Sequence, residues 1–216
     1  MAIGVAKKDN DASVPVAIMS EAPNRVSAIY QFEGFNWQLS FDAGKTIFRP
    51  AITRASSVII QKYEEMLASG TMFNSISLYN ALVDAESAGT KFEAKGTKKV
   101  RGRAAYVVEM KTAKGQPVRL LFDAENFMWV RSEYGSVRIT KDMGTFTNAV
   151  GSKDEESTID FYVETTDFKE VDGVKLPFKL EMVATSPILR QRNVGTIVTN
   201  INEYRHNIQI DPKMFQ

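Results

Sequence analysis

The sequence predicts an α+β fold, in which a strongly curved antiparallel sheet of about ten strands forms an incomplete β-barrel covered by a helical hairpin. Two observations predict it. Apolar and polar residues alternate along most of the chain, and one stretch, residues 56–88, has the helical period instead. A sheet this wide curls and leaves an interior that strand side chains alone do not fill, so we expect the hairpin to fill or roof it. The length of 216 residues suits one domain, residues 1–216.

The first part of the chain alternates with a period of two. Trp37, Leu39 and Phe41 alternate with polar neighbours, which indicates a strand with one buried and one solvated face. Pro50 ends this part. We expect strands at residues 3–7, 14–20, 25–33, 36–42 and 46–49.

Residues 56–88 are expected to form two helices. Ser56 or Ser57 can cap the first helix and Gly70 can stop it, whereas the second starts near residue 74 or 75 and stops at Gly89. The apolar residues of the first helix recur at three- and four-residue spacing: Ile59, Ile60, Tyr63, Met66 and Leu67. Those of the second are Ile76, Tyr79, Leu82 and Val83.

The alternation resumes after the hairpin. Asp172-Gly173, between two alternating runs, is the strongest short hairpin signal that a sequence offers. Residues 141–157 are polar and lack an apolar period, so we expect a long surface loop there. We expect strands at residues 92–96, 104–111, 117–123, 127–134, 158–169, 174–184 and 194–204.

Charge argues against a nucleic-acid partner. The chain has 27 basic and 26 acidic residues and a net charge of +1, whereas phosphate-binding surfaces need clustered Lys and Arg. The densest basic run, residues 98–103, is interpreted as a solvated strand end beside a turn, with a phosphate site as the weaker alternative. No apolar run approaches the ~20 residues that span a bilayer, so we expect no transmembrane segment.

Catalytic chemistry has few candidate residues. The chain has no cysteine and one histidine, His206, so thiolate nucleophiles are absent and a zinc site of the usual kind is nearly excluded. It has no glycine-rich phosphate loop and no Gly-x-Ser-x-Gly nucleophile elbow. Residues 154–156 are acidic, and calcium chelation there is the weaker alternative to a solvated loop. We expect a protein that is not an enzyme, with no catalytic residue, metal or cofactor.

Apolar content is the remaining clue to function. The chain has thirteen Phe, seven Tyr, two Trp and nine Met, and Met suits surfaces that accept irregular shapes. The apolar stripes either pack as ordinary core or line a site for an apolar ligand, such as a lipid or acyl chain, between the concave sheet and the helices. The candidate ligand-binding residues are Ile59, Tyr63, Met66, Leu67, Met72, Phe73, Tyr79 and Leu82 from the helical stretch and Trp37, Phe41, Phe178 and Leu180 from the sheet.

The first ten residues lack the basic and then apolar pattern of a signal peptide. Two expectations follow: the protein is cytosolic, or a targeting segment has been trimmed from this sequence. The strand-like start at residues 1–5 favours trimming.

Five segments resemble the LolA-like lipoprotein-localisation superfamily, which includes outer-membrane lipoprotein-sorting proteins. Residues 22–25 resemble the start of its opening sheet, and residues 95–106 are similar to its strand-turn-strand pattern G-x-x-x-V-x-G-x-x-A-Y. Residues 121–125, Leu-Phe-Asp-Ala-Glu, resemble its next hairpin, with Asn126 in place of the usual Thr. Residues 167–177 and 207–215 resemble its D-y-x-x-v-d-G-v-x-l-P and closing N-x-x-i-d-x-x-x-F patterns. These are mainly signatures of turns and strands.

The resemblance implies an incomplete β-barrel plugged by helices, an apolar cavity between them, and a location in the periplasm or cell envelope. It implies a non-enzymatic protein that binds a lipid, an acyl chain or another apolar ligand such as a lipoprotein, with an envelope protein as a further partner. The family's N-terminal helix is not visible ahead of Ile3, and no position matches the chaperone's lid-locking arginine, so the resemblance is to the broad branch of the family. The alternative is a cell-envelope interaction or scaffold module whose cavity is filled by its own side chains.

Overall fold

Most of the described chain lies in one antiparallel sheet. The computed structural model describes residues 1–9, 11–21, 25–42, 45–50, 57–73, 89–111, 117–139, 157–185 and 193–215. The strands are β1 (Ala2–Lys8), β2 (Val14–Glu21), β3 (Arg25–Phe32), β4 (Phe35–Asp42), β5 (Lys45–Arg49), β6 (Lys91–Val100), β7 (Arg103–Lys111), β8 (Val118–Asp123), β9 (Trp129–Ile139), β10 (Ser157–Val171), β11 (Val174–Thr185) and β12 (Asn193–Tyr204). The helices are α1 (Ser57–Ala68) and the short 3-10 helix η2 (Pro212–Phe215).

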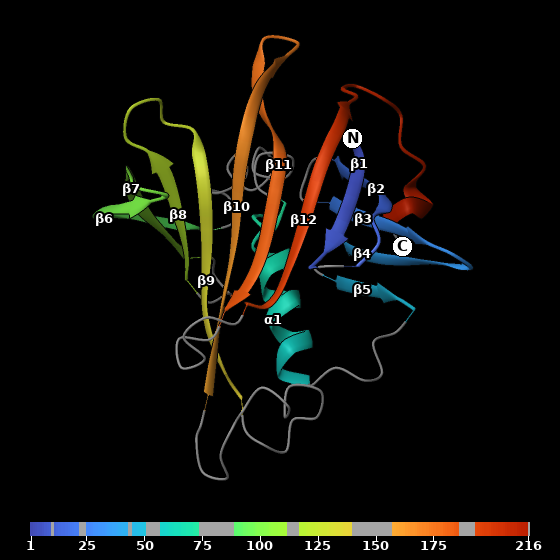
Figure 1. The fold of residues 1–216 in the computed structure, drawn as a ribbon, viewed down its shortest axis with the longest axis horizontal. Coiled ribbons are helices and arrows are strands. Elements are labelled where there is room, and N and C mark those ends of the chain that lie inside the picture. Colours follow the sequence, from blue (N-terminus) through green and yellow to red (C-terminus); the bar gives the residue numbers. More distant parts are fainter. Residues whose placement is uncertain are drawn as a thin grey trace.

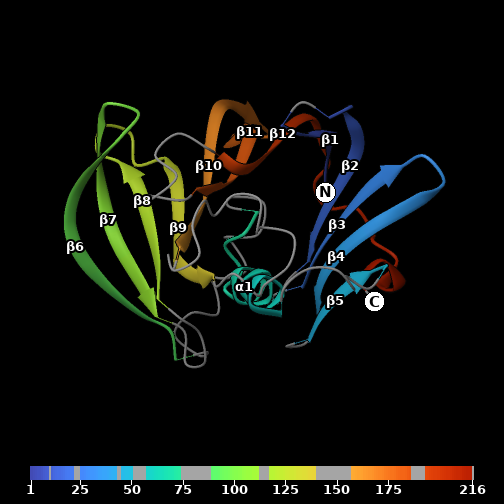
Figure 2. The same ribbon diagram turned by 60° about the horizontal axis from the view of Figure 1, so that its bottom comes forward.

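The strand order is β5-β4-β3-β2-β1-β12-β11-β10-β9-β8-β7-β6 (Figure 1). Two meanders, β1 to β5 and β6 to β12, are therefore joined by the pairing of β1 with β12. Figure 2 shows that the sheet curls into an arch with β5 and β6 at its two open ends and with α1 inside it.

The predicted fold class is wrong. The described residues form twelve strands in one open, curled sheet and a single α-helix of 12 residues, rather than an α+β sheet of about ten strands covered by a helical hairpin. The physical reason is that the curl brings apolar faces of distant strands around α1, so the sheet encloses most of the core by itself. The predicted second helix, residues 74–88, lies outside the described residues.

The predicted strands are confirmed, with ends that differ by a few residues. The predicted strand at residues 92–96 continues through a bulge at Gly96 to Val100, and the one at residues 127–134 runs on to Ile139. The Asp172-Gly173 hairpin is confirmed, because both residues have the positive φ that a two-residue turn of this kind requires, 50° and 80°. The predicted loop at residues 141–157 lies outside the described residues except for its last residue, which begins β10.

The first predicted helix is confirmed as α1. Gly70 ends it as expected: its φ is 70°, and its N–H donates to the carbonyl oxygen of Leu67 at 2.9 Å. The left-handed residue turns the chain so that Thr71, Met72 and Phe73 leave the helix and remain buried. Both α1 and the turn after it therefore contribute buried residues to the core.

The junction of β1 and β12 is tightly packed. The register shifts between Ile3 and Gly4, and a Cβ atom on Gly4 would lie 2.0 Å from the carbonyl oxygen of Asn200. Only glycine allows the two backbones to approach this closely. The strand pair that joins the two meanders therefore depends on the absence of a side chain at this position.

The outer face of the sheet is partly covered. Phe215 of η2 is fully buried, and the guanidinium carbon of Arg25 lies 4.4 Å from the centre of its ring. At the other end of the sheet, the β6-β7 turn lies over the outer face, where Arg101 bonds Glu164 of β10 at 2.7 Å and Glu181 of β11 at 2.6 Å. Ion pairs thus link neighbouring strands on the polar outer face. The concave face is the main apolar surface of the sheet.

Candidate ligand-binding site

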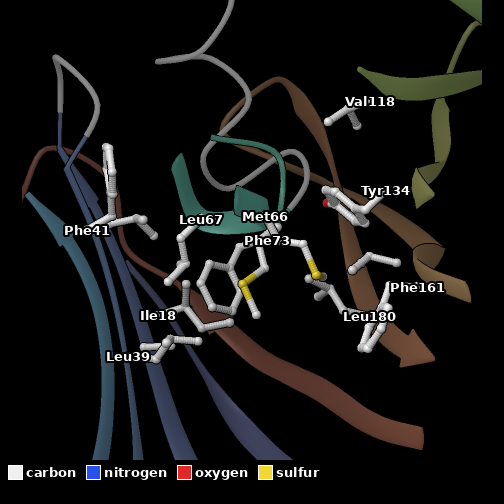
Figure 3. Close-up of a cluster of buried hydrophobic side chains, with 14 of the residues drawn as sticks. Ile18, Leu39, Phe41, Met66, Leu67, Phe73, Val118, Tyr134, Phe161 and Leu180 are labelled. Atoms are coloured by element: carbon white, nitrogen blue, oxygen red, sulfur yellow. The ribbon is translucent and has the colours of Figure 1, made fainter. Parts of the chain in front are cut away.

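The concave face of the sheet and α1 enclose a cluster of apolar side chains, which we call the chamber. Figure 3 shows Met66, Leu67 and Phe73 between residues of the first meander, such as Leu39, and residues of the second, such as Leu180. The strand residues of the chamber are buried because every second side chain of each strand faces inward. They include Ile18, Ala28, Leu39, Phe41, Leu120, Ile159, Phe161, Val163, Leu180 and Ile201.

Four predicted ligand-binding residues lie at the centre of the chamber. Met66 and Leu67 of α1 are 0% exposed, and Met72 and Phe73 of the following turn are 2% and 3% exposed. Their side chains fill the space between the two halves of the arch. The structure therefore brings these residues together as predicted, although contact with a ligand stays a prediction.

The sheet residues predicted for the site also contact the chamber. Phe41 and Leu180 are buried in it, and Trp37 and Phe178 are half-buried against it. Tyr63 of α1 packs its ring edge-on against Phe161, with the ring centres 6.1 Å apart. Nine of the twelve predicted residues thus have side chains in one cluster: Phe41, Met66, Leu67, Met72, Phe73 and Leu180, with Trp37, Tyr63 and Phe178 at its margin.

The other three predicted residues lie outside the described part of the chain, or their side chains do. Ile59 lies in α1, but its side chain is not among those described. Tyr79 and Leu82 lie in the range 74–88, which the structure does not describe. Their place in the site stays a prediction.

A polar network at the end of α1 was not predicted. The hydroxyl of Ser69 donates to the carbonyl oxygen of Met66 at 2.6 Å and lies 2.7 Å from that of Thr71. The Thr71 hydroxyl donates to the phenol oxygen of Tyr134 on β9 at 3.1 Å, and that phenol also bonds Ser132. Buried hydroxyls must pair, so this network fixes the helix terminus to the sheet. The sequence contains no signal that would pair Thr71 with a residue in β9.

Burial changes the acidity of the phenols around the chamber. It raises the pKa of Tyr30, Tyr63 and Tyr134 above the ordinary tyrosine value, because the phenolate would lose its hydration. For Tyr134, the hydrogen bonds from Thr71 and Ser132 offset part of this effect. These side chains remain neutral at physiological pH, so the chamber wall formed by them carries no phenolate.

A cavity of about 380 Å³ lies between α1 and β9. Val58, Lys62 and Glu65 line it from the helix, and Tyr134 and Val137 line it from the strand. The Lys62 ammonium is almost fully buried and lies 3.1 Å from the Glu65 carboxylate. This cavity, and two others of about 270 and 510 Å³ on the outer face, are lined by none of the twelve predicted ligand-binding residues. None of these three cavities lies at the predicted residues, although the one between α1 and β9 reaches Tyr134 and Val137 of the chamber.

His206 lies outside the chamber, where its Nδ1 is 2.9 Å from a carboxylate oxygen of Asp172 at the exposed β10-β11 turn. Within the described ranges, no three His, Cys, Asp or Glu side chains gather where they could hold a metal ion. No helix in the same ranges is long and apolar enough to cross a membrane. What the chamber offers chemically is apolar contact area with neutral hydroxyls at one margin.

The arched sheet around a helix is similar to the fold of a solved LolA superfamily protein. A LolA superfamily protein from Nitrosomonas europaea superposes with a TM-score of 0.52 at 11% identity, covering 100% of this chain and 87% of that chain. A DUF1329 family protein from Desulfovibrio piger gives a TM-score of 0.45 at 10% identity, covering 100% of this chain and 88% of that one.

A third similar structure is a domain from Vibrio parahaemolyticus provisionally described as an outer membrane lipoprotein-sorting protein. It gives a TM-score of 0.48 at 10% identity and covers 99% of this chain and 88% of that chain. No protein-family model and no curated protein sequence matches this chain. At these identities the likeness concerns the fold, and the chain has a LolA-like fold.

Proposed function

We propose that the protein is a non-enzymatic cell-envelope protein, located in the periplasm, that binds a lipid or acyl chain in the chamber. One observation carries the proposal. One short segment, α1 and its turn, places Met66, Leu67 and Phe73 between the apolar faces of the two halves of the sheet (Figure 3). The LolA-like fold and the sorting role stated for the Vibrio parahaemolyticus domain agree with it.

Binding requires displacement of the side chains that now fill the chamber. Burial of Met66, Leu67, Met72 and Phe73 stabilises the closed form by about 1.5–3 kcal/mol each, or about 6–12 kcal/mol together. An acyl chain of about sixteen carbons recovers about 12 kcal/mol at ~0.8 kcal/mol per methylene, whereas a chain of about eight carbons recovers half of that. Movement of α1 away from the sheet would admit the chain. Affinity should therefore rise steeply with acyl length.

The proposal is tested with purified protein and a dansyl-labelled undecanoic acid. The indole of Trp129, which is buried in the chamber wall, should transfer energy to the bound dansyl group. Palmitate should compete with the probe and octanoate should not. Met72→Ala should tighten binding severalfold because it leaves space, whereas Met214→Ala, at an exposed methionine of η2, should change nothing. No saturable binding, together with no lipid found by mass spectrometry of the extracted protein, would contradict the proposal.

The alternative is a cell-envelope interaction module whose chamber is permanently filled. The complete burial of Met66 and Leu67, and the position of the cavities away from the predicted residues, favour it. In that case Met72→Ala lowers stability without creating a binding site. The same titration therefore separates the two functions.

A further inference from the structure

Charge is distributed unevenly over the sheet. The strands β6, β7 and β8, with the turn between β6 and β7, carry eight basic and three acidic residues, a net charge of +5 in a chain whose total is +1. The remainder of the chain is accordingly acidic. Such an asymmetry concentrates a positive field at one end of the sheet.

The bases of this region are exposed, whereas two of the carboxylates that pair with them, Glu109 and Glu133, are largely buried. Lys95, Lys98, Lys111 and Arg119 have side chains that are 34–57% exposed, and together with Lys91 they form what we call the basic face. The carboxylates below them, Glu109 and Glu133, are only 10% and 17% exposed. Glu109 has three cations within 3.1–3.8 Å of its oxygens. Glu93 is the exposed exception, 60% exposed and 2.6 Å from Lys95, so a partner approaching this face meets more cations than carboxylates.

The basic face is hollowed and ends at an edge strand of the sheet. A groove of about 510 Å³ is lined by the cations Lys98, Arg119 and Arg131, by the carboxylates of Glu109, Glu133 and Asp160, and by Tyr162. Strand β6 is the last in the sheet order, and nine of its ten residues are exposed. Within the described ranges no strand pairs with its outer backbone edge, which can accept an added strand.

The shape distinguishes between anionic partners. A planar bilayer does not enter a groove, whereas an extended polypeptide lies along it and can pair with a strand edge. Lysines on an edge strand also disfavour pairing with basic strands and with another copy of β6, because like charges meet. An acidic strand is the partner that these lysines favour.

We propose that the basic face and the β6 edge bind an acidic, extended segment of a partner protein. The surface lies on the outside of the sheet, away from the chamber, so the proposal does not depend on ligand binding by the chamber. Of the basic run at residues 98–103, it gives a binding function to Lys98, whereas Arg101 pairs with Glu164 and Glu181.

The test uses fluorescence anisotropy with a labelled ten-residue peptide of alternating Glu and Thr, and a Gln-Thr peptide of the same length as control. The acidic peptide should bind, and binding should weaken about tenfold or more between about 50 and 300 mM NaCl because salt screens exposed charges. The affinity for the acidic peptide should fall by a similar factor in the fourfold variant Lys95→Gln, Lys98→Gln, Lys111→Gln and Arg119→Gln. The matched control changes the same net charge elsewhere, with Lys7→Gln, Lys8→Gln, Lys175→Gln and Lys213→Gln, and should bind within about twofold of wild type.

Hydrogen exchange locates the bound peptide. Amides of β6 should become protected when the acidic peptide is added, while those of β5, at the other sheet edge, should not change. If the fourfold variant does not fold, the double variant Lys91→Gln and Arg119→Gln replaces it, because Glu109 then keeps Lys95 and Lys111. Three results would each overturn the proposal. They are an equal loss of peptide affinity in the control variant, no binding of the acidic peptide by the wild type, and binding only to phosphatidylglycerol vesicles or to single-stranded DNA.

Discussion

Truncation of Leu67 tests whether α1 is an integral part of the core. The side chain is 0% exposed and lies in the chamber, so Leu67→Ala removes its apolar contacts and leaves a void. Such changes cost about 2–5 kcal/mol, and we expect the lower half of that range because flexible Met66 and Met72 can move into the space. In a chain of this size the loss corresponds to roughly 5–10 °C in Tm. Alanine is a good helix former, so the loss reports packing and not helix propensity.

The assay is urea unfolding followed by tryptophan fluorescence, since Trp129 lies in the chamber and Trp37 packs against it. The matched control is Gln61→Ala, at an exposed position of the same helix, which should change the free energy of unfolding by less than about 0.5 kcal/mol. If Leu67→Ala also costs less than about 1 kcal/mol with an unchanged urea dependence, α1 does not belong to the cooperative core and the reasoning fails.

Three further predictions concern the sheet and the polar network. Gly4→Ala should cost about 3 kcal/mol or more, measured by urea unfolding, because its Cβ meets the facing backbone of β12, whereas Gly195→Ala, with no atom closer than 3.8 Å, should be tolerated. Glu164→Gln should lower the free energy of unfolding by about 1–3 kcal/mol, because Arg131 loses a buried charged partner. A melting temperature equal to that of wild type would contradict this. Burial raises the pKa of Tyr134, so the folded state keeps a proton that the unfolded chain loses above pH ~10. Stability should therefore fall as the pH rises further. Tyr134→Phe should make the melting temperature fall less steeply with pH in this range.

Local structure followed from the sequence wherever a short-range signal decides it. Period-two alternation placed the strands, and the left-handed preference of glycine placed the end of α1 at Gly70 and the turn at Gly173. The basic run at residues 98–103 was correctly interpreted as a strand end beside a turn, which is the β6-β7 turn. The same patterns also selected the residues that meet in the chamber. The alternation of apolar and polar residues along a strand or helix indicates which side chains face the core.

Long-range arrangement did not follow from the sequence. Alternation shows which side of a strand is buried but not which strand lies beside it, so the pairing of β1 with β12 had no local signal. The bond from Thr71 to Tyr134 joins residues 63 positions apart, and neither hydroxyl is distinguishable from a solvated one in sequence. The helical period of residues 56–88 led to the wrong fold class, because periodicity does not show how much of a core a curled sheet can enclose alone.

The β1-β12 junction has a consequence for the order of assembly. The two meanders can each form from neighbouring segments, but they become one sheet only when the last strand of the chain meets the first, across nearly 200 residues of intervening sequence. During synthesis, the backbone edge of β1 that pairs with β12 therefore has no partner until β12 has been made. Contacts of such sequence separation slow folding, so this interval is when the chain most needs protection from pairing with other strands.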